Sequence, residues 1–175
     1  SYAALEAQAA AIADDVAYDA HDVDDGLRAG LFTLEDLREV DFLADILDEI
    51  ARWRPGLEPM RVVHELGRRV ITRFVEDILK ESARRLEEAA PPDADAVRAQ
   101  SRALIAPSAA MAKADADMKR FLFRRMYRHS DVMRVRAHGD EVLRELFHFY
   151  VRHPDEMPPE RRPALAEEAV VARAV

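Results

Sequence analysis

The sequence contains no cysteine, which excludes disulfide bonds and thiolate metal sites and is compatible with a reducing compartment. No apolar run approaches the roughly 20 residues that a helix needs to cross a bilayer, and no signal peptide is visible. We therefore expect a cytoplasmic protein with no membrane partner. Glycine-rich phosphate loops and nucleophile elbows are also missing, so metal-assisted hydrolysis is favoured over covalent catalysis.

Strand signals are absent as well, because no alternating run of β-branched residues reaches strand length. Only 5 of the 175 residues are glycine, while Ala, Leu, Glu and Arg recur at helical spacing. A hydrophobic fraction of 49% is enough for one domain with a core. The residues predict an all-α, multi-helix bundle. Its net charge of -8 argues against non-specific binding of nucleic acid by the chain as a whole.

Proline pairs, glycines and capping residues divide the chain into helices. The longer expected helices span residues 3–27, 42–53, 59–89, 108–127 and 131–153. Shorter ones are expected after Thr33, from Asp93 or Asp95 through Arg102, and after Pro163. The chain has no internal repeat and no low-complexity linker, so we expect a single α-helical unit over residues 1–175.

Six aspartates lie within twelve residues of the first expected helix, between Asp14 and Asp25. Aspartate is roughly 0.5–0.7 kcal/mol per residue worse than alanine in a helix, so six of them cost about 3–4 kcal/mol. Like charges one turn apart, such as Asp15 and Asp19, add repulsion. This cost indicates that something other than stability selects short carboxylates here.

These residues divide between two faces of the helix at about 100° per residue. The apolar face contains Leu5, Ile12, Val16, Val23 and Leu27. The opposite face contains Asp14, Tyr18, His21, Asp22 and Asp25. Such a ladder can hold one ligand of a hard divalent cation and contact a polar substrate one and two turns further on. An ordinary solvated acidic face fits the same geometry equally well.

Residues 13–18 (ADDVAY), His21-Asp22 and residues 25–31 (DGLRAGL) resemble bacterial dGTP triphosphohydrolase-like proteins of the HD-domain superfamily. Residues 118–129 (MKRFLFRRMYRH), followed by Val132-Met133, are similar to a second segment of that family. The resemblance runs from the first residues to about Pro159, and residues 61–71 contribute less specifically. It implies an HD-domain-like bundle that cleaves a deoxynucleoside triphosphate to the deoxynucleoside and triphosphate with a divalent metal.

By this resemblance Asp14 matches the last metal ligand, while Tyr18 and Asp22 match positions that contact the deoxyribose. Asp15 matches a variable position and receives no role. The implied metal is Mg²⁺ or Mn²⁺, or another transition metal. His21-Asp22 does not match the metal-binding pair that names the superfamily, because that pair lies upstream on another helix.

The resemblance also implies that the chain is a fragment, with the upstream histidine and aspartate ligands and the C-terminal signature missing. Residues 1–30 would then carry the end of the active-site region, and no catalytic residue is assigned within the chain. We expect the fragment alone to be inactive and the full protein to be a homo-oligomer. The alternative is a non-catalytic helical module for oligomer assembly or regulatory nucleotide binding.

Basic residues gather in two other places. Lys119, Arg120, Arg124, Arg125 and Arg128 surround Phe121, Leu122 and Tyr127, a composition that suits polyphosphate or single-stranded nucleic acid. The alternative is that these residues pair with carboxylates of this acidic chain. Arg61, Arg68 and Arg69 could also reach phosphate oxygens, since guanidinium binds phosphate in a bidentate manner.

Overall fold

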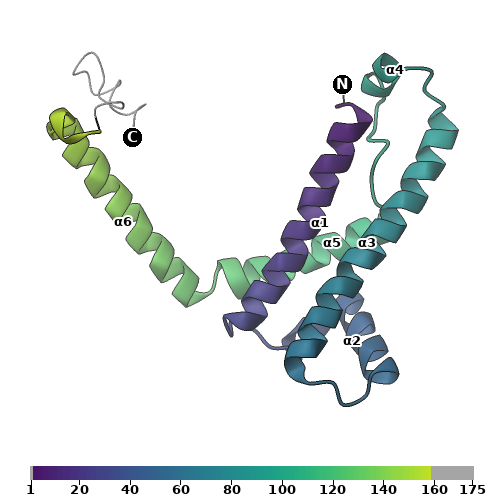
Figure 1. Cartoon of the computed structure of the whole chain (residues 1–175), viewed down its shortest axis with the longest axis horizontal. Coiled ribbons are helices and arrows are strands. Elements are labelled where there is room, and N and C mark those ends of the chain that lie inside the picture. Colours follow the sequence, from purple (N-terminus) through teal and green to yellow (C-terminus); the bar gives the residue numbers. More distant parts are fainter. Residues whose placement is uncertain (1, 159–175) are drawn as a thin grey trace. The chain divides into compact units, whose positions relative to one another are not determined.

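The computed structural model describes residues 2–158 (Figure 1), and every regular element in this range is helical. The expected all-α fold is therefore confirmed. The chain forms two compact parts, one ending at Tyr127 and the other starting at Arg128. The helix expected after Pro163 lies outside the described residues.

Two long helices of the first part, α1 (Leu5–Arg28) and α3 (Pro59–Ala89), pack antiparallel along each other (Figure 1). Helix α2 (Asp41–Trp53) packs against α3, and α5 (Ala109–Leu122) packs against α1. Helix α1 is therefore in contact on two sides, with α3 and with α5. This arrangement decides which of its aspartates reach solvent.

The contact surfaces between these helices follow the expected 3.6-residue spacing. Helix α3 buries an apolar row, which comprises Val63, Leu66, Val70, Phe74 and Ile78. Helix α2 turns a second row toward it, which comprises Leu43, Ile46, Leu47 and Ile50. Full burial of one such side chain stabilises the fold by about 1.5–3 kcal/mol.

Capping side chains occur at the positions that the sequence indicates. Thr33 and Asp36 form a reciprocal pair before the short helix η1 (Asp36–Glu39): the Thr33 N–H donates to Asp36 at 2.8 Å, and the Asp36 N–H donates to the Thr33 hydroxyl at 3.2 Å. Ser108 accepts a hydrogen bond from the first turn of α5. Asp93, rather than Asp95, caps the short helix α4 (Ala94–Arg98).

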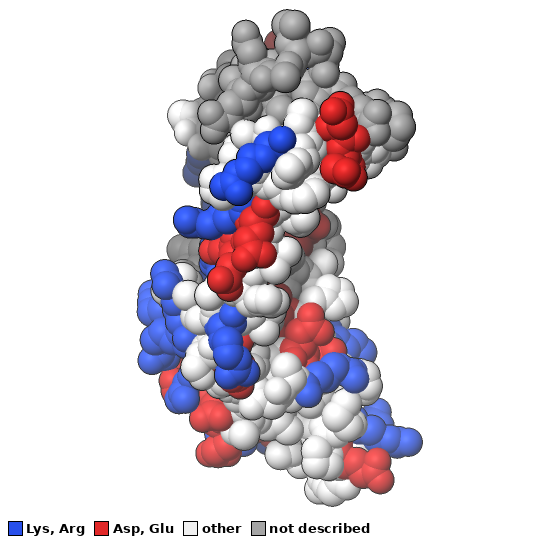
Figure 2. All heavy atoms as spheres, turned by 90° about the vertical axis from the view of Figure 1, so that its left-hand side faces the viewer, with Lys and Arg blue, Asp and Glu red and all other residues white. Residues whose placement is uncertain are grey.

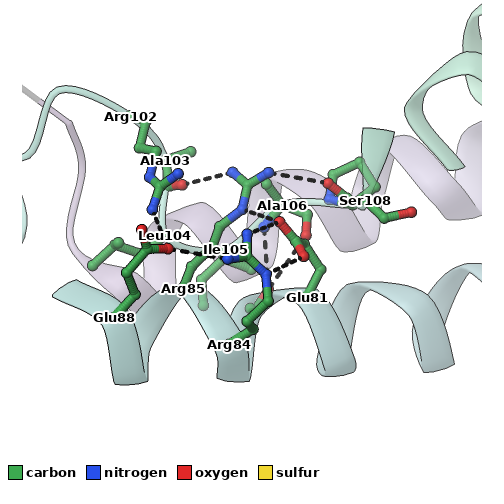
Figure 3. Close-up of polar contacts among 12 residues, drawn as sticks. Glu81, Arg84, Arg85, Glu88, Arg102, Ala103, Leu104, Ile105, Ala106 and Ser108 are labelled. Carbon is green, nitrogen blue, oxygen red and sulfur yellow. Dashed lines mark hydrogen bonds and ion pairs between the residues drawn. The ribbon is translucent and has the colours of Figure 1, made fainter. Parts of the chain in front are cut away.

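The segment between α4 and α5 is tied to the second half of α3 by polar contacts (Figure 3). The guanidinium of Arg85 donates to the carbonyls of Ala103 at 2.9 Å and Pro107 at 3.3 Å. Glu81 accepts hydrogen bonds from Arg84 and Arg85, which lower the pKa of its carboxyl to about 2. These contacts hold the start of α5 against α3, and α5 in turn supports α1.

One expected helix, residues 108–127, has a different end in the structure. The α-helix stops at Leu122 and continues as a π-helical turn, η2 (Phe123–Tyr127). A π turn widens the helix by one residue and so changes the direction of the side chains that follow. Here it carries Tyr127, which contacts α1.

The second part begins with Arg128 and contains α6 (Ser130–Arg152) and a short 3-10 turn, η3 (Pro154–Glu156). The ring of His129 accepts a hydrogen bond from the backbone N–H of Asp131, 3.3 Å away, and so caps α6. These bounds agree with the helix expected over residues 131–153.

Candidate functional site

The aspartate-rich stretch of α1 divides into exposed and buried members. Asp14 is exposed and Tyr18 is 59% exposed, whereas Asp22 is 7% exposed and Asp19 only 4%. The sequence placed Asp22 on the face opposite the apolar one, and the structure differs because α5 and the π turn cover that side of α1. The expected ladder therefore changes from exposed to buried along its length.

Asp22 is held by a tyrosine from the π turn. The hydroxyl of Tyr127 donates a hydrogen bond to Oδ2 of Asp22. Burial raises the pKa of the Tyr127 phenol, and the hydrogen bonds to Asp22 and Tyr18 raise it further. The phenol thus stays protonated at physiological pH and remains a donor to the carboxylate. Asp22, Tyr127 and Tyr18 form one connected polar cluster.

Asp19 forms a second cluster with Lys119 of α5. The ammonium of Lys119 lies 3.4 Å from Oδ2 of Asp19, 3.1 Å from Asp115 and 3.8 Å from Asp15. Oδ2 of Asp19 is fully buried and accepts no aligned hydrogen bond, although Lys119 is within ion-pair distance. Burial raises the pKa of Asp19 to about 7, and the nearby Asp115 adds to the shift while Lys119 opposes it.

Asp14 has no ion-pair partner among residues 2–158 and is free to act as a single ligand. No group of three or more His, Asp or Glu side chains in this range is arranged to hold a metal ion. One exposed carboxylate binds Mg²⁺ or Mn²⁺ only weakly, because these ions keep most of their water at sparse sites. The described residues therefore do not fit a divalent metal by themselves.

An apolar groove lies between α1 and α3. It encloses about 380 Å³, and the α1 side is formed by small residues that include Ala13 and Ala17. On the α3 side Ile71, Val75 and Leu79 are 38%, 44% and 66% exposed. Apolar ridges of this kind usually mark a surface that another segment covers.

The basic residues of α5 and the π turn are paired with carboxylates. Arg120 bonds Asp117 at 2.7 Å, and Arg124 and Arg125 both contact Glu39. On the face shown in Figure 2, Lys and Arg lie among Asp and Glu. These contacts support the pairing interpretation of this segment, and binding of single-stranded nucleic acid stays a prediction.

Two residues at α1 were not assigned to it from the sequence. Lys119 and Tyr127 were grouped with the basic cluster, yet both contact aspartates of the first helix. Both belong to residues 118–129, the second segment of the resemblance. Two separate segments that resemble the same family could have indicated that they meet in the fold. Helical spacing could not, because Tyr127 and Asp22 are 105 positions apart.

Comparison with known proteins shows which family the chain is similar to. Residues 105–175 match the family model of the phosphohydrolase-associated domain. The chain is 46% identical over 176 residues to deoxyguanosinetriphosphate triphosphohydrolase-like protein 1 of Mesorhizobium japonicum, with 99% of this chain and 44% of the relative aligned. This chain belongs to the dGTP triphosphohydrolase-like family.

Other members of the dGTP triphosphohydrolase-like family show the same degree of similarity. The protein of Bradyrhizobium diazoefficiens is 49% identical, with 91% of this chain and 40% of the relative aligned. The protein of Rhodopseudomonas palustris is 48% identical, with 93% and 40% aligned. The chain thus spans less than half the length of these relatives. Among residues 2–158, no helix is long and apolar enough to cross a membrane.

Proposed function

We propose that this chain is part of a metal-dependent deoxynucleoside triphosphate triphosphohydrolase, which hydrolyses a dNTP to the deoxynucleoside and triphosphate. The observation that carries the proposal is the row Asp14, Tyr18 and Asp22 on α1, one helical turn apart, within a segment that resembles the dGTP triphosphohydrolase-like family. The names of the aligned relatives support the same reaction class.

In this proposal Asp14 supplies one anionic ligand to Mg²⁺, Mn²⁺ or another divalent transition metal. The other ligands come from parts of the protein outside this chain, because residues 2–158 do not form a ligand set. The apolar groove between α1 and α3 supports this arrangement, because such a surface is usually covered by another segment. A segment packed into the groove would lie against α1, the helix that carries Asp14.

In this proposal Tyr18 and Asp22 recognise the deoxyribose of the substrate. The exposed ring of Tyr18 can pack against C2′ of a deoxyribose and leave no room for a 2′-hydroxyl. Oδ2 of Asp22 is occupied by Tyr127. The remaining carboxylate oxygen is then the acceptor for the 3′-hydroxyl, and the bond from Tyr127 fixes its direction.

The 175-residue chain alone is expected to be inactive, since it offers one of several metal ligands. The full protein is expected to be a homo-oligomer in the cytoplasm. The second candidate function is a non-catalytic module for oligomer assembly or regulatory nucleotide binding. Metal content of the full protein separates the two, because an assembly module holds no metal at Asp14.

The decisive experiment is a substrate screen of the intact protein that measures triphosphate release from each of the four dNTPs. We expect release from at least one dNTP and loss of it on chelation of divalent metal. Release from none of them, in protein shown to be folded and metal-loaded, would overturn the proposal. Strong activity of the isolated 175-residue chain would overturn the assignment of the missing ligands.

A further inference from the structure

Nearly all arginines of the first part are neutralised by carboxylates. Of the fifteen arginines between residues 2 and 127, all except Arg52, Arg54 and Arg61 form an ion pair. Two of these three exceptions, Arg54 and Arg61, line the same hollow. In a chain with a net charge of -8, two unpaired guanidinium groups at one place point to an anionic ligand.

The hollow lies where α2 ends and α3 begins, and it encloses about 290 Å³. Arg54 follows α2 directly, and Gly56, with φ of +80°, turns the chain toward α3. Arg61, His64 and Arg68 come from the first half of α3. Their spacing of three and four residues places them along one face of that helix.

The single carboxylate in this hollow does not cancel its charge. Glu65 accepts hydrogen bonds from Arg68 at 2.8 and 3.0 Å and from Arg69 at 2.8 Å. These bonds lower the pKa of Glu65 to about 2, so it is ionised and already engaged. The guanidinium groups of Arg54 and Arg61 keep their donors available. The imidazole of His64 adds another hydrogen-bonding group.

A second hollow of about 240 Å³ adjoins the first, and the two share Arg54 and Leu57. Its lining is largely apolar and includes Leu34, Ala51 and Val62. The only charged groups in it besides Arg54 are Glu35 and Arg38, which pair with each other at 3.2 Å. The combined site is basic at one end and apolar at the other, with Arg54 at the boundary.

We propose that this composite hollow binds an organic phosphate with a flat, largely apolar body, such as a mononucleotide. The phosphate lies against Arg54, Arg61 and His64, where guanidinium forks match its oxygens in a bidentate manner. The body enters the apolar hollow. A phosphate ligand fits better than a carboxylate ligand. Arg54, Arg61 and Arg68 carry three positive charges, and a phosphate carries more negative charge than a single carboxylate.

This site contains none of Asp14, Tyr18 and Asp22, and it does not depend on the proposed hydrolase function. Its test uses the 175-residue chain and deoxyadenosine 5′-monophosphate, which has no triphosphate to hydrolyse. Binding is measured by isothermal titration calorimetry without divalent metal. Deoxyadenosine and inorganic phosphate are titrated separately as the two halves of the ligand.

We expect deoxyadenosine 5′-monophosphate to bind at least tenfold more tightly than either half. Arg54→Ala and Arg61→Ala should each weaken it at least tenfold. Arg52→Ala is the matched control, an unpaired arginine two positions away that does not line the hollow, and it should leave binding unchanged.

Equal weakening by Arg52→Ala would mean non-specific attraction to surface charge and would overturn the proposal. Unchanged affinity in both Arg54→Ala and Arg61→Ala would overturn it as well. Inorganic phosphate that binds as tightly as the nucleotide would overturn the assignment of the apolar hollow. Because all substituted arginines are exposed, unfolding is not expected, and circular dichroism of each variant checks this.

Discussion

Tyr127 and Asp22 lie 105 positions apart in the sequence, and the phenol of the first donates a hydrogen bond to the carboxylate of the second. This bond joins the π turn after α5 to the aspartate-rich helix α1. It also satisfies a carboxylate that is only 7% exposed. The two segments that resemble the family, one in α1 and one at residues 118–129, therefore contact each other through this pair of side chains.

Tyr127→Phe removes the donor and leaves the Asp22 carboxylate buried without this partner. The loss of a hydrogen bond to a buried charged group costs about 1.5–3 kcal/mol. We expect the free energy of unfolding in urea to fall by that amount. Tyr2→Phe is the control, because Tyr2 is 40% exposed and lies outside this cluster, and it should change stability by less than about 0.5 kcal/mol. Equal losses in the two variants would contradict a specific role for Tyr127.

Asp19→Asn should alter the pH dependence of stability. The pKa of Asp19 is raised from 3.8 to about 7 in the folded protein. The folded state therefore holds this proton more tightly than the unfolded state, and stability is lost as pH rises from about 4 to 7. Asparagine has nearly the same shape as a protonated aspartate and stays neutral at every pH, so the variant does not lose this stability.

Thermal unfolding of both proteins from pH 4 to pH 8 measures the effect of Asp19→Asn. We expect similar stability at pH 4 and a growing advantage of the variant up to about pH 7. Asp15→Asn is the matched control, since Asp15 also faces Lys119 but its side chain is 72% exposed. A constant difference between Asp19→Asn and the wild type at every pH would show that Asp19 is not a buried titrating group.

Gly26→Ala should destabilise the packing of the last turn of α1 against Phe32. A Cβ at position 26 would lie 2.2 Å from the ring of Phe32. That ring is buried and packs edge-on against Phe121 at 5.1 Å, so it has little room to move. Overpacking of this kind costs about 1–3 kcal/mol.

Gly67→Ala provides the control for Gly26→Ala. Gly67 also lies within a helix, but a Cβ there meets no atom within 4 Å. Alanine is a better helix former than glycine by about 1 kcal/mol, so this variant should be more stable. In chemical denaturation, the free energy of unfolding is expected to fall in Gly26→Ala and to rise in Gly67→Ala. A stabilising Gly26→Ala would contradict the packing of Phe32 against α1.

The sequence predicted the helices well because their start and stop signals are local. Thr33, Asp93 and Ser108 cap the turns that directly follow them, and Pro55-Gly56 ends α2 within its own few residues. The apolar spacing of α3 likewise depends only on that helix. Fold class and most helix bounds could therefore be read from neighbouring residues.

The environment of the site could not be predicted in the same way. Burial of Asp19 and Asp22 depends on Lys119 and Tyr127, which reach α1 only after the chain has folded. The π turn that carries Tyr127 has no local stop signal, so the sequence predicted one continuous helix through residue 127. Helical periodicity assigned Asp22 to a solvent-exposed face, because the spacing of residues within α1 gives no information about α5 packing against that face.

Asp14→Ala in the intact protein should lower metal occupancy and triphosphate release together. The side chain is exposed and unpaired among the described residues, so its removal should leave the fold intact and relieve poor helix propensity. Metal analysis of purified protein and a melting curve measure both effects. Asp25→Ala, at another exposed aspartate of α1, is the control and should keep its metal. Normal metal content and rate in Asp14→Ala would favour the solvated-face interpretation.

The last prediction separates sugar recognition from metal binding on α1. The row advances about 6 Å per four-residue step, so a phosphate near Asp14 places a deoxyribose beside Tyr18 and Asp22. Tyr18→Ala should relax discrimination against ribonucleotides, because the ring no longer excludes a 2′-hydroxyl. Asp22→Asn retains an oxygen that can accept from Tyr127 but loses the charge offered to the 3′-hydroxyl. A lost charge-assisted hydrogen bond of about 1.5–3 kcal/mol lowers kcat/KM by about 10- to 150-fold. Both variants should keep their metal, so metal loss in both, or unchanged selectivity together with unchanged kcat/KM, would refute this division of roles.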